Sequence, residues 1–131
     1  MSSFSDYTEN LVLNYLFTTE TATRPTAWYV GLFTSAPSDT GGGTEVSGNA
    51  YVRKVTGTIT VAGTATTATN AAAIEFAAAT GGDWGAIGWA AIFDAESGGT
   101  MLAWAQLTTS RTINDGDVLR IPASSLTITL T

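Results

Sequence analysis

Short stretches of alternating apolar and small polar residues fill the sequence from Pro25 onward, and turn residues separate them. An alternation with a period of two places the apolar side chains on one face of a β-strand. The stretch SLTITL at 125–130 follows this pattern, and the preceding Asp115–Gly116 pair is typical of a tight turn. About seven or eight such stretches predict a mainly all-β fold, an antiparallel β-sandwich or jelly-roll-like domain.

One short helix is predicted at the N-terminus, within residues 1–20. Ser5 or Asp6 offers a side-chain oxygen that can cap the start of the helix, and Asp6 with Glu9 three residues later resembles a capping box. The acidic residues of this first turn also suit the positive end of the helix dipole. The helix is expected to end within this range, since Pro25 excludes further helix soon afterwards.

An apolar stripe is predicted along this helix. Tyr7, Leu11 and Tyr15 recur every fourth residue, and so do Val12 and Leu16. Residues four apart lie above one another on the same side of a helix. The helix should therefore present one apolar side to another part of the fold.

The stretch TAWYVGLFTS at 26–35 is apolar on both faces. Trp28 and Val30 share one parity of the expected strand, whereas Tyr29 and Phe33 share the other. A strand that is apolar on both faces is normally covered on both. We expect the N-terminal helix, or a neighbouring subunit, to cover one of these two faces.

Length and composition indicate a single domain, residues 1–131, whose surface carries unusually little charge. A chain of 131 residues is long enough to bury a core of its own. Charged residues make up 12% of the chain, which is about half of the usual fraction. A surface rich in Thr, Ala, Ser and Gly costs little to desolvate against a partner, so the composition favours assembly.

The charge balance and two missing residue types exclude several functions. A net charge of −6 argues against binding to a nucleic-acid backbone, which requires clustered Lys and Arg. The sequence has no cysteine, so it has neither disulfides nor thiolate metal sites nor a cysteine nucleophile. It also has no histidine, which is the usual general base. We therefore expect no cofactor, no metal and no enzymatic activity.

No targeting or membrane segment is evident. The first ten residues lack the basic start and apolar run of a secretory signal. No stretch approaches the roughly 18 apolar residues of a membrane span. We expect a protein that is made in the cytoplasm, has no membrane partner and is later assembled into a particle.

Residues 36–50 are predicted to form a long, flexible glycine-rich loop. They contain Pro37, the run Gly41–Gly43 and Gly48, and they have little apolar content. A connection of this length within a compact domain is usually functional or disordered. The run is not a phosphate-binding loop, because no Gly-Lys-Ser/Thr sequence follows it. A mobile arm that reaches another protein is the preferred interpretation.

Two acidic groupings could suggest chemistry. Asn114, Asp115 and Asp117 resemble the start of a calcium loop, but the closing glutamate and the flanking helices are missing. A hairpin turn explains them better. The carboxylates that could serve a glycosidase are Glu45, Glu75, Asp94 and Glu96. No spacing unites any two of them, so a solvated surface position explains each.

Aromatic and basic residues offer two further candidates. Three of the four tryptophans lie within strand patterns and are expected in the core, whereas Trp84 follows a glycine-rich turn and is the best exposed candidate for a sugar platform. Arg53–Lys54 is the only adjacent basic pair. It favours either a salt bridge to an acidic partner or a neighbouring subunit, or a plain solvated position.

Taken in order along the chain, several segments resemble a known group of proteins. These are GLFTSAP, EVSGNAYVRK and DWG followed by AIFDA, with INDGDVLRIPASSLTITLT at the end. Together they resemble a widespread family of small virion proteins of tailed bacteriophages. Members are often labelled tail fibre or minor tail proteins, and some are similar to head decoration (cement) proteins. The resemblance covers nearly the whole chain and implies a phage structural protein located in the virion.

The hypothesis from sequence is a head decoration protein, forming a homotrimer on the major capsid protein and stabilising contacts between capsomers. A tail, collar or fibre-base protein bound to other virion proteins is one alternative, and a carbohydrate-binding module for host attachment is another. Exposure and apolar content suggest a set of interface residues: Glu45, Tyr51, Arg53, Lys54, Trp84, Tyr7 and Leu11.

Overall fold

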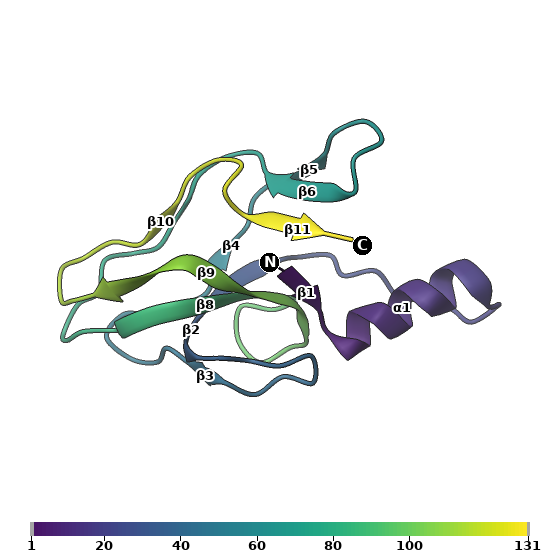
Figure 1. Cartoon of the computed structure of the whole chain (residues 1–131). Coiled ribbons are helices and arrows are strands. Elements are labelled where there is room, and N and C mark those ends of the chain that lie inside the picture. The colour runs from purple at the N-terminus through teal and green to yellow at the C-terminus, as the bar shows by residue number, and fades with distance from the viewer. Residues whose placement is uncertain (1, 131) are drawn as a thin grey trace.

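The computed structural model of the protein describes residues 2–130 and consists mostly of short antiparallel strands (Figure 1). In chain order the elements are β1 (Ser2–Phe4), α1 (Asp6–Phe17), β2 (Tyr29–Ser35), β3 (Thr44–Glu45), β4 (Lys54–Val55), β5 (Ile59–Val61), β6 (Thr67–Asn70), β7 (Ile74–Glu75), β8 (Gly85–Phe93), β9 (Met101–Ile113), β10 (Arg120–Ile121) and β11 (Thr127–Thr129). The predicted all-β fold with one N-terminal helix is confirmed.

The main sheet has the strand order β1-β9-β8-β2-β3, and β4 also pairs with β2. All of these pairs are antiparallel. The centre of the sheet is set by small residues, since Ala90 of β8 lies between Leu32 of β2 and Ala105 of β9. The long hairpin of β8 and β9 therefore forms the scaffold on which the other strands are arranged.

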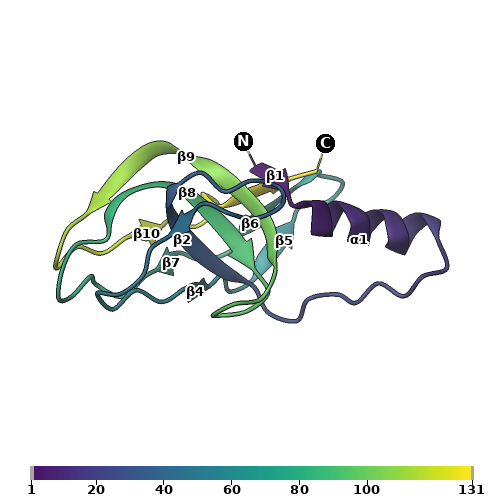
Figure 2. The ribbon, with the colours of Figure 1, turned by 90° about the horizontal axis from the view of Figure 1, so that it is seen from below.

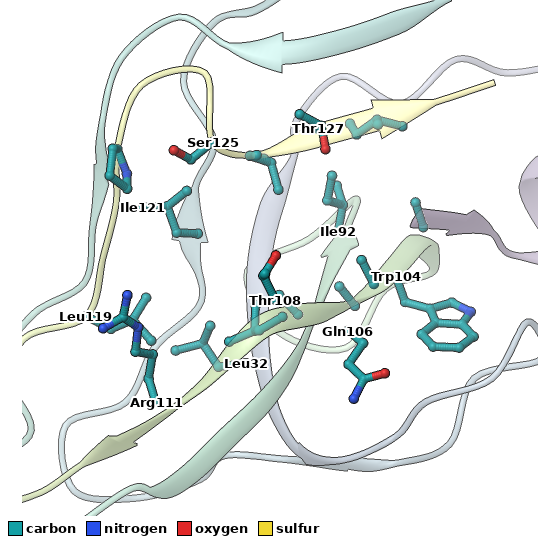
Figure 3. Close-up of a pocket in the computed structure, with 18 of the residues that line it drawn as sticks. Leu32, Ile92, Trp104, Gln106, Thr108, Arg111, Leu119, Ile121, Ser125 and Thr127 are labelled. Atoms are coloured by element: carbon teal, nitrogen blue, oxygen red, sulfur yellow. The ribbon is translucent and has the colours of Figure 1, made fainter. Parts of the chain in front are cut away.

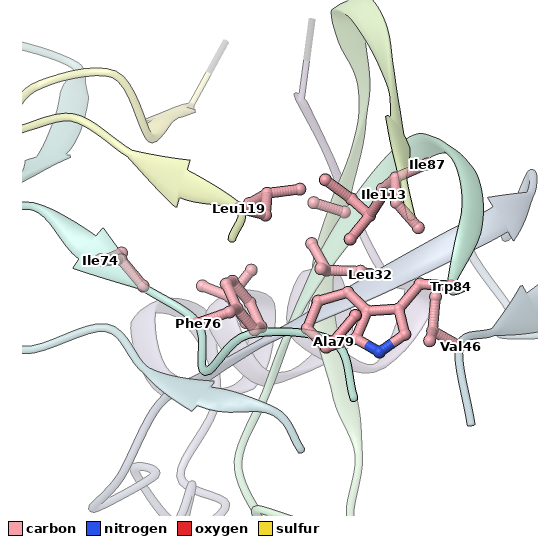
Figure 4. Packing of buried hydrophobic residues seen from close by; sticks show 11 residues of the cluster. Leu32, Val46, Ile74, Phe76, Ala79, Trp84, Ile87, Ile113 and Leu119 are labelled. Carbon is pink, nitrogen blue, oxygen red and sulfur yellow. The ribbon is translucent and has the colours of Figure 1, made fainter. Parts of the chain in front are cut away.

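Two small sheets form a second layer over one face of the main sheet (Figures 1 and 2). One pairs β10 with β7, and the other has the order β11-β6-β5. The main core lies between the layers (Figure 4). Its buried members are Val30, Leu32, Val46, Ile74, Phe76, Ala79, Trp84, Ile87, Ala90, Ile113 and Leu119. Burial of these side chains is the main force that holds the layers together.

A second, smaller apolar cluster lies on the opposite face of the main sheet. It contains Phe33, Ala91, Phe93 and Met101. The rings of Phe33 and Phe93 stack with their centroids 6.1 Å apart. Strand β2 is thus apolar on both faces and covered on both, as its sequence predicts.

The helix begins where the sequence predicts but packs differently. Ser5 is the N-cap, with its side chain accepting from the Thr8 N–H at 3.3 Å, so Asp6 already belongs to the first turn. No residue of α1 is buried, and the helix projects from one end of the sandwich (Figure 2). The prediction that the helix covers one face of β2 is wrong. The segments around Glu45 and Arg53 cover the face of the main sheet that carries Phe33 and Phe93.

Residues 36–50 are more structured than an open loop. A tight turn joins Ser38 and Gly41 by two backbone hydrogen bonds, and β3 then pairs with the edge of β2. Gly43 has a φ of +73°, and a Cβ there would lie 2.8 Å from the Pro37 nitrogen. Val46 enters the main core. Part of the predicted loop is therefore a strand, because glycine permits the chain to fold back closely onto β2. Its flexibility and its contact with another protein stay predictions.

Candidate functional site

Three of the predicted interface residues meet one another inside the chain. The Arg53 guanidinium donates from Nε to Glu45 Oε1 at 2.7 Å and from Nη2 to Oε2 at 2.8 Å. The Tyr51 hydroxyl donates to the same Oε1 at 2.8 Å. The two charged groups therefore satisfy each other, whereas the sequence suggested that they would find partners across a subunit boundary. We call Glu45, Tyr51 and Arg53 the charge cluster.

The topology explains why these residues converge. Strands β3 and β4 pair one after the other with the same edge of β2, opposite Phe33 and Tyr29 respectively. Glu45 ends β3 and Arg53 precedes β4, so residues eight apart in sequence lie side by side. Tyr51 lies in the segment that connects the two short strands. Shared pairing with one strand edge is what builds the charge cluster.

Arg53 makes further contacts that saturate its side chain. Its Nη1 donates to the Ala95 carbonyl at 3.0 Å and to the Gly98 carbonyl at 2.7 Å. The guanidinium carbon lies 3.5 Å from the centroid of the Phe93 ring, which is a cation–π contact. Only 8% of the Arg53 side chain is exposed. The residue clamps the turn between β8 and β9 onto the outer face of the main sheet.

Tyr51 connects the charge cluster to the main core. Its hydroxyl accepts from the Leu32 N–H at 2.9 Å, and its ring stacks on Phe76 at 6.3 Å. Burial raises the pKa of Tyr51 well above its usual value, and the Glu45 carboxylate raises that pKa further. The Leu32 N–H acts in the opposite direction. The phenol therefore stays protonated and keeps donating to Glu45.

Trp84 is a core residue and not an exposed platform. Only 5% of it is exposed, its indole N–H donates to the Asn49 carbonyl at 2.9 Å, and its ring meets Tyr51 edge-on at 5.4 Å. The prediction of exposure is wrong because the backbone N–H of Trp84 also pairs with Ile113, which draws the strand entry inward. The carbohydrate-binding hypothesis thereby loses Trp84, the aromatic residue that the sequence suggested for a sugar platform.

The remaining predicted interface residues lie elsewhere and do not form one site. Lys54 is exposed on β4, next to the charge cluster in sequence but outside its hydrogen bonds. Tyr7 and Leu11 lie on α1, where Tyr7 is 45% exposed and Leu11 is half-buried. The structure thus brings together three of the seven predicted residues and places Trp84 beside Tyr51 in the core.

The second half of α1 carries several large apolar side chains that remain in contact with water. Exposed fractions are 57% for Leu13, 73% for Tyr15, 60% for Leu16 and 76% for Phe17. Since successive helical residues are rotated by about 100°, Leu13, Leu16 and Phe17 lie on one side of the helix and Tyr15 lies on the opposite side. The segment LNYLF carried this signal in the sequence, but the predicted stripes began at Tyr7 and Val12 and left out Leu13 and Phe17, which are also four residues apart.

A groove of about 420 Å³ with a mixed apolar and polar lining lies between the main sheet and the C-terminal segment (Figure 3). Ile92, Ala103, Ala105, Leu107, Leu119, Ile121, Leu126 and Ile128 supply its apolar lining. Arg111 and Arg120 are its charged lining residues, and among residues 2–130 no acidic side chain lines it. Arg120 faces Glu75 at 3.7 Å in an exposed ion pair. No pattern in the sequence indicates this groove, because the packing of the two layers creates it.

Two other features bear on what the described part of the chain can do. Within residues 2–130, no three Asp, Glu, His or Cys side chains converge to form a metal site. Across the same residues, no helix has the length and apolar character needed to cross a membrane. The side chains of the charge cluster are instead paired with one another.

Comparison with known proteins identifies one family. The family model described as podophage GP4 fiber I protein gp80 matches residues 3–129, which is nearly the whole chain. No curated protein matches the sequence. The match confirms the resemblance to phage virion structural proteins, whereas a place on the head stays a prediction from sequence.

Proposed function

This chain belongs to the podophage GP4 fiber I protein gp80 family of phage virion structural proteins, and we propose that it is a component of the tail-fibre assembly. The observation that carries the proposal is the extent of the family match, residues 3–129. The matched region includes the helix, the charge cluster and both layers of the sandwich. The description of the matching family names a fibre protein, which agrees with the tail or fibre-base alternative proposed from the sequence.

The proposed role is structural and not catalytic. The charge cluster is the strongest polar grouping. Its hydrogen bonds are made within the chain and stabilise the outer face of the main sheet. The features left open to partners are the apolar last turn of α1 and the groove beside β9. We propose that its partners are other virion proteins and further copies of this chain, with no nucleic acid, cofactor or membrane.

Head decoration is the second candidate. The observation that favours it is the low charged fraction of 12%, which suits a module that binds the same surface many times over a shell. A decoration protein would stabilise the capsid by mass action, since it binds the assembled shell and not its separate subunits. The same fold serves either place, and the two candidates differ in location and copy number.

Quantitative mass spectrometry of purified particles, combined with immunogold labelling, distinguishes the two places. A fibre component is expected at the tail, in far fewer copies than the major capsid protein. A decoration protein would label the head, with a copy number comparable to that of the major capsid protein. An antibody against the major capsid protein controls for access to the particle. Absence of the chain from washed particles would contradict both candidates.

A glycan array with the purified chain tests the carbohydrate-binding alternative separately. We expect no specific binding, because Trp84 and Tyr51 are committed to the core and the charge cluster. Specific retention of one glycan class would instead support a direct role in host attachment.

A further inference from the structure

Residues 2–17, which form β1 and α1, are joined to the rest of the chain at one small site. We call these residues the strap and residues 29–130 the body. We propose that copies of this chain exchange their straps, so that β1 of one copy completes the main sheet of another. The inference concerns the isolated chain and does not depend on where in the virion the protein sits.

The edge of β9 is the first attachment of the strap. Strand β1 pairs with this edge, and Phe4 lies directly opposite Ala103. The Ser5 N–H and the Thr8 hydroxyl both donate to the Leu102 carbonyl, at 3.0 and 2.7 Å. Backbone pairing and the first turn of α1 therefore bind the same short stretch of β9.

Asp39, in the turn between β2 and β3, is the second attachment. Its carboxylate accepts from the Ser3 hydroxyl at 2.9 Å, and its backbone carbonyl accepts from the Asp6 N–H at 2.9 Å. The same carboxylate oxygen accepts from the Trp104 indole N–H at 2.9 Å. Since Asp39 and Trp104 both belong to the body, their bond does not need the strap. The receiving site is thus formed by the body alone.

Little else retains the strap. No residue of α1 is buried. Within the described chain, residues 21–27 of the following connection make no hydrogen bond to the body. Segments with few buried contacts and an untethered connection open at a lower free energy than the core. The strap can therefore detach while the body stays folded.

A second copy of the strap is the partner that fits the vacated site. Detachment leaves an open strand edge on β9, and an open edge readily pairs with another chain. The strap of a second copy restores the bonds to Leu102 and Asp39 with the same atoms and the same register. A different strand would lack donors at the positions of Ser3, Ser5 and Thr8. Exchange of an identical element is a low-cost route to association for this reason.

The connection from the strap to the body is long enough for exchange. Residues 18–28 join α1 to β2 and contain no helix or strand. These 11 residues can extend over about 36–40 Å, which is more than the roughly 30 Å diameter of a small domain. A strap bound to one body can therefore remain joined to a second body beside it.

Exchange also gives a physical reason for the exposed apolar side of α1. Leu13, Leu16 and Phe17 lie on one side of the helix and are 57%, 60% and 76% exposed. In the single chain this end of the helix projects away from the sandwich (Figure 2). In the exchanged form the helix is anchored on one body, and its far end leads directly to the other. The apolar side then lies between two bodies, where its burial stabilises the assembly.

The absence of cysteine allows a direct test by cross-linking the full chain. Phe4→Cys and Ala103→Cys are made in separate chains and mixed. Directly opposite residues of an antiparallel pair have Cα atoms about 4.5–5.5 Å apart, which suits a disulfide. A link between the two variants requires the strap of one chain to lie on β9 of the other, because Ala103 is only 5% exposed. The double variant in one chain shows that this disulfide can form.

Two controls accompany the mixture. Phe4→Cys mixed with Val61→Cys reports random collisions, since Val61 lies on β5 and is 58% exposed. Hydrogen exchange at the Ser5 N–H of the wild type gives the time that the strap needs to open, and the incubation is made longer than this. Circular dichroism checks that each variant remains folded.

A non-reducing gel and mass spectrometry measure the result. We expect the Phe4→Cys and Ala103→Cys mixture to give at least about ten times more linked dimer than the control, because exchange holds the two sulfurs together. A yield no higher than that of the control would overturn the proposal, since the strap then stays on its own body.

Sedimentation velocity of the wild type over a concentration series tests the exchange without any substitution. We expect a discrete oligomer at high concentration, and a ring of three would agree with the homotrimer predicted from the sequence. A wild type that stays monomeric at millimolar concentration contradicts exchange. An oligomer whose straps do not cross-link would also contradict it, because another surface then joins the copies. These results do not bear on the copy number that tests the place in the virion.

Discussion

The charge cluster and α1 are both surface features that the sequence marks as candidate contact sites, yet the fold uses them in opposite ways. The cluster has charges, a tyrosine and nearby glycines, and every one of its strong donors and acceptors is paired within the chain. The second half of the helix is mostly apolar, and Leu13, Leu16 and Phe17 remain exposed there. Charged and hydrogen-bonding residues can thus have a structural role, whereas the surface that stays available to a partner is apolar.

The largest difference between the two regions should appear on replacing Arg53. Arg53→Met keeps the aliphatic stem but removes the two-pronged pair with Glu45, the donors to two carbonyls and the cation–π contact. We expect the free energy of unfolding to fall by about 2–4 kcal/mol, since the half-buried Glu45 carboxylate loses its counter-charge. Urea denaturation measures this change.

The neighbouring Lys54→Met is the matched control for Arg53→Met. Lys54 is exposed on β4, so its replacement should change the free energy of unfolding by no more than about 0.5 kcal/mol. Similar losses for both variants would show that charge in this segment matters only in a general way and that the charge cluster has no special structural role.

The sequence predicted the regular parts of the fold well, because local patterns determine them. The run at 26–35 that is apolar on both faces identifies β2, and the capping residues locate the start of α1 within one residue. These patterns act over a few neighbouring residues and are visible without knowledge of the partners. The same holds for the turns between the longer strands.

The contacts between regions could not be predicted in this way. Glu45 and Arg53 meet only because two very short strands share one edge of β2, and strands of two residues have no periodicity to detect. Trp84 is buried by a backbone bond to Ile113, which lies 29 positions further along the chain, from 84 to 113. The groove exists only once the two layers have packed. Sequence patterns therefore describe the elements, and the pairing of the elements decides which residues stay free.

A smaller effect is expected for the hydroxyl of Tyr51. Tyr51→Phe leaves the Leu32 N–H and one oxygen of Glu45 without this partner, inside a half-buried site. We expect a loss of about 1–3 kcal/mol in the free energy of unfolding. Tyr15→Phe on α1 is the matched control, since Tyr15 is 73% exposed, and it should have almost no effect. A loss for Tyr15→Phe equal to that for Tyr51→Phe would contradict the distinction between the two regions.

The same tyrosine should also make stability depend on alkaline pH. Burial raises the pKa of Tyr51 in the folded chain, whereas an unfolded tyrosine titrates near about 10. The folded state therefore holds this proton more tightly, so the contribution is complete below about pH 10 and declines as the pH rises further. The decline should approach about 1.4 kcal/mol per pH unit. Urea titrations of the wild type and of Tyr51→Phe isolate it, and equal slopes for both proteins would refute the assignment to Tyr51.

The smallest effect on the stability of the single chain is expected at the end of α1. Phe17→Ser removes an aromatic ring that is 76% exposed, and serine and phenylalanine differ little in helix propensity. In a solution dilute enough to keep the chain monomeric, the free energy of unfolding should change by no more than about 0.5 kcal/mol. Phe33→Ser provides the contrast, because Phe33 is buried against Phe93 and its loss should cost about 3–5 kcal/mol. Comparable losses for the two phenylalanines would mean that α1 packs on its own sandwich in solution, and the helix would then no longer be the surface that is kept for a partner.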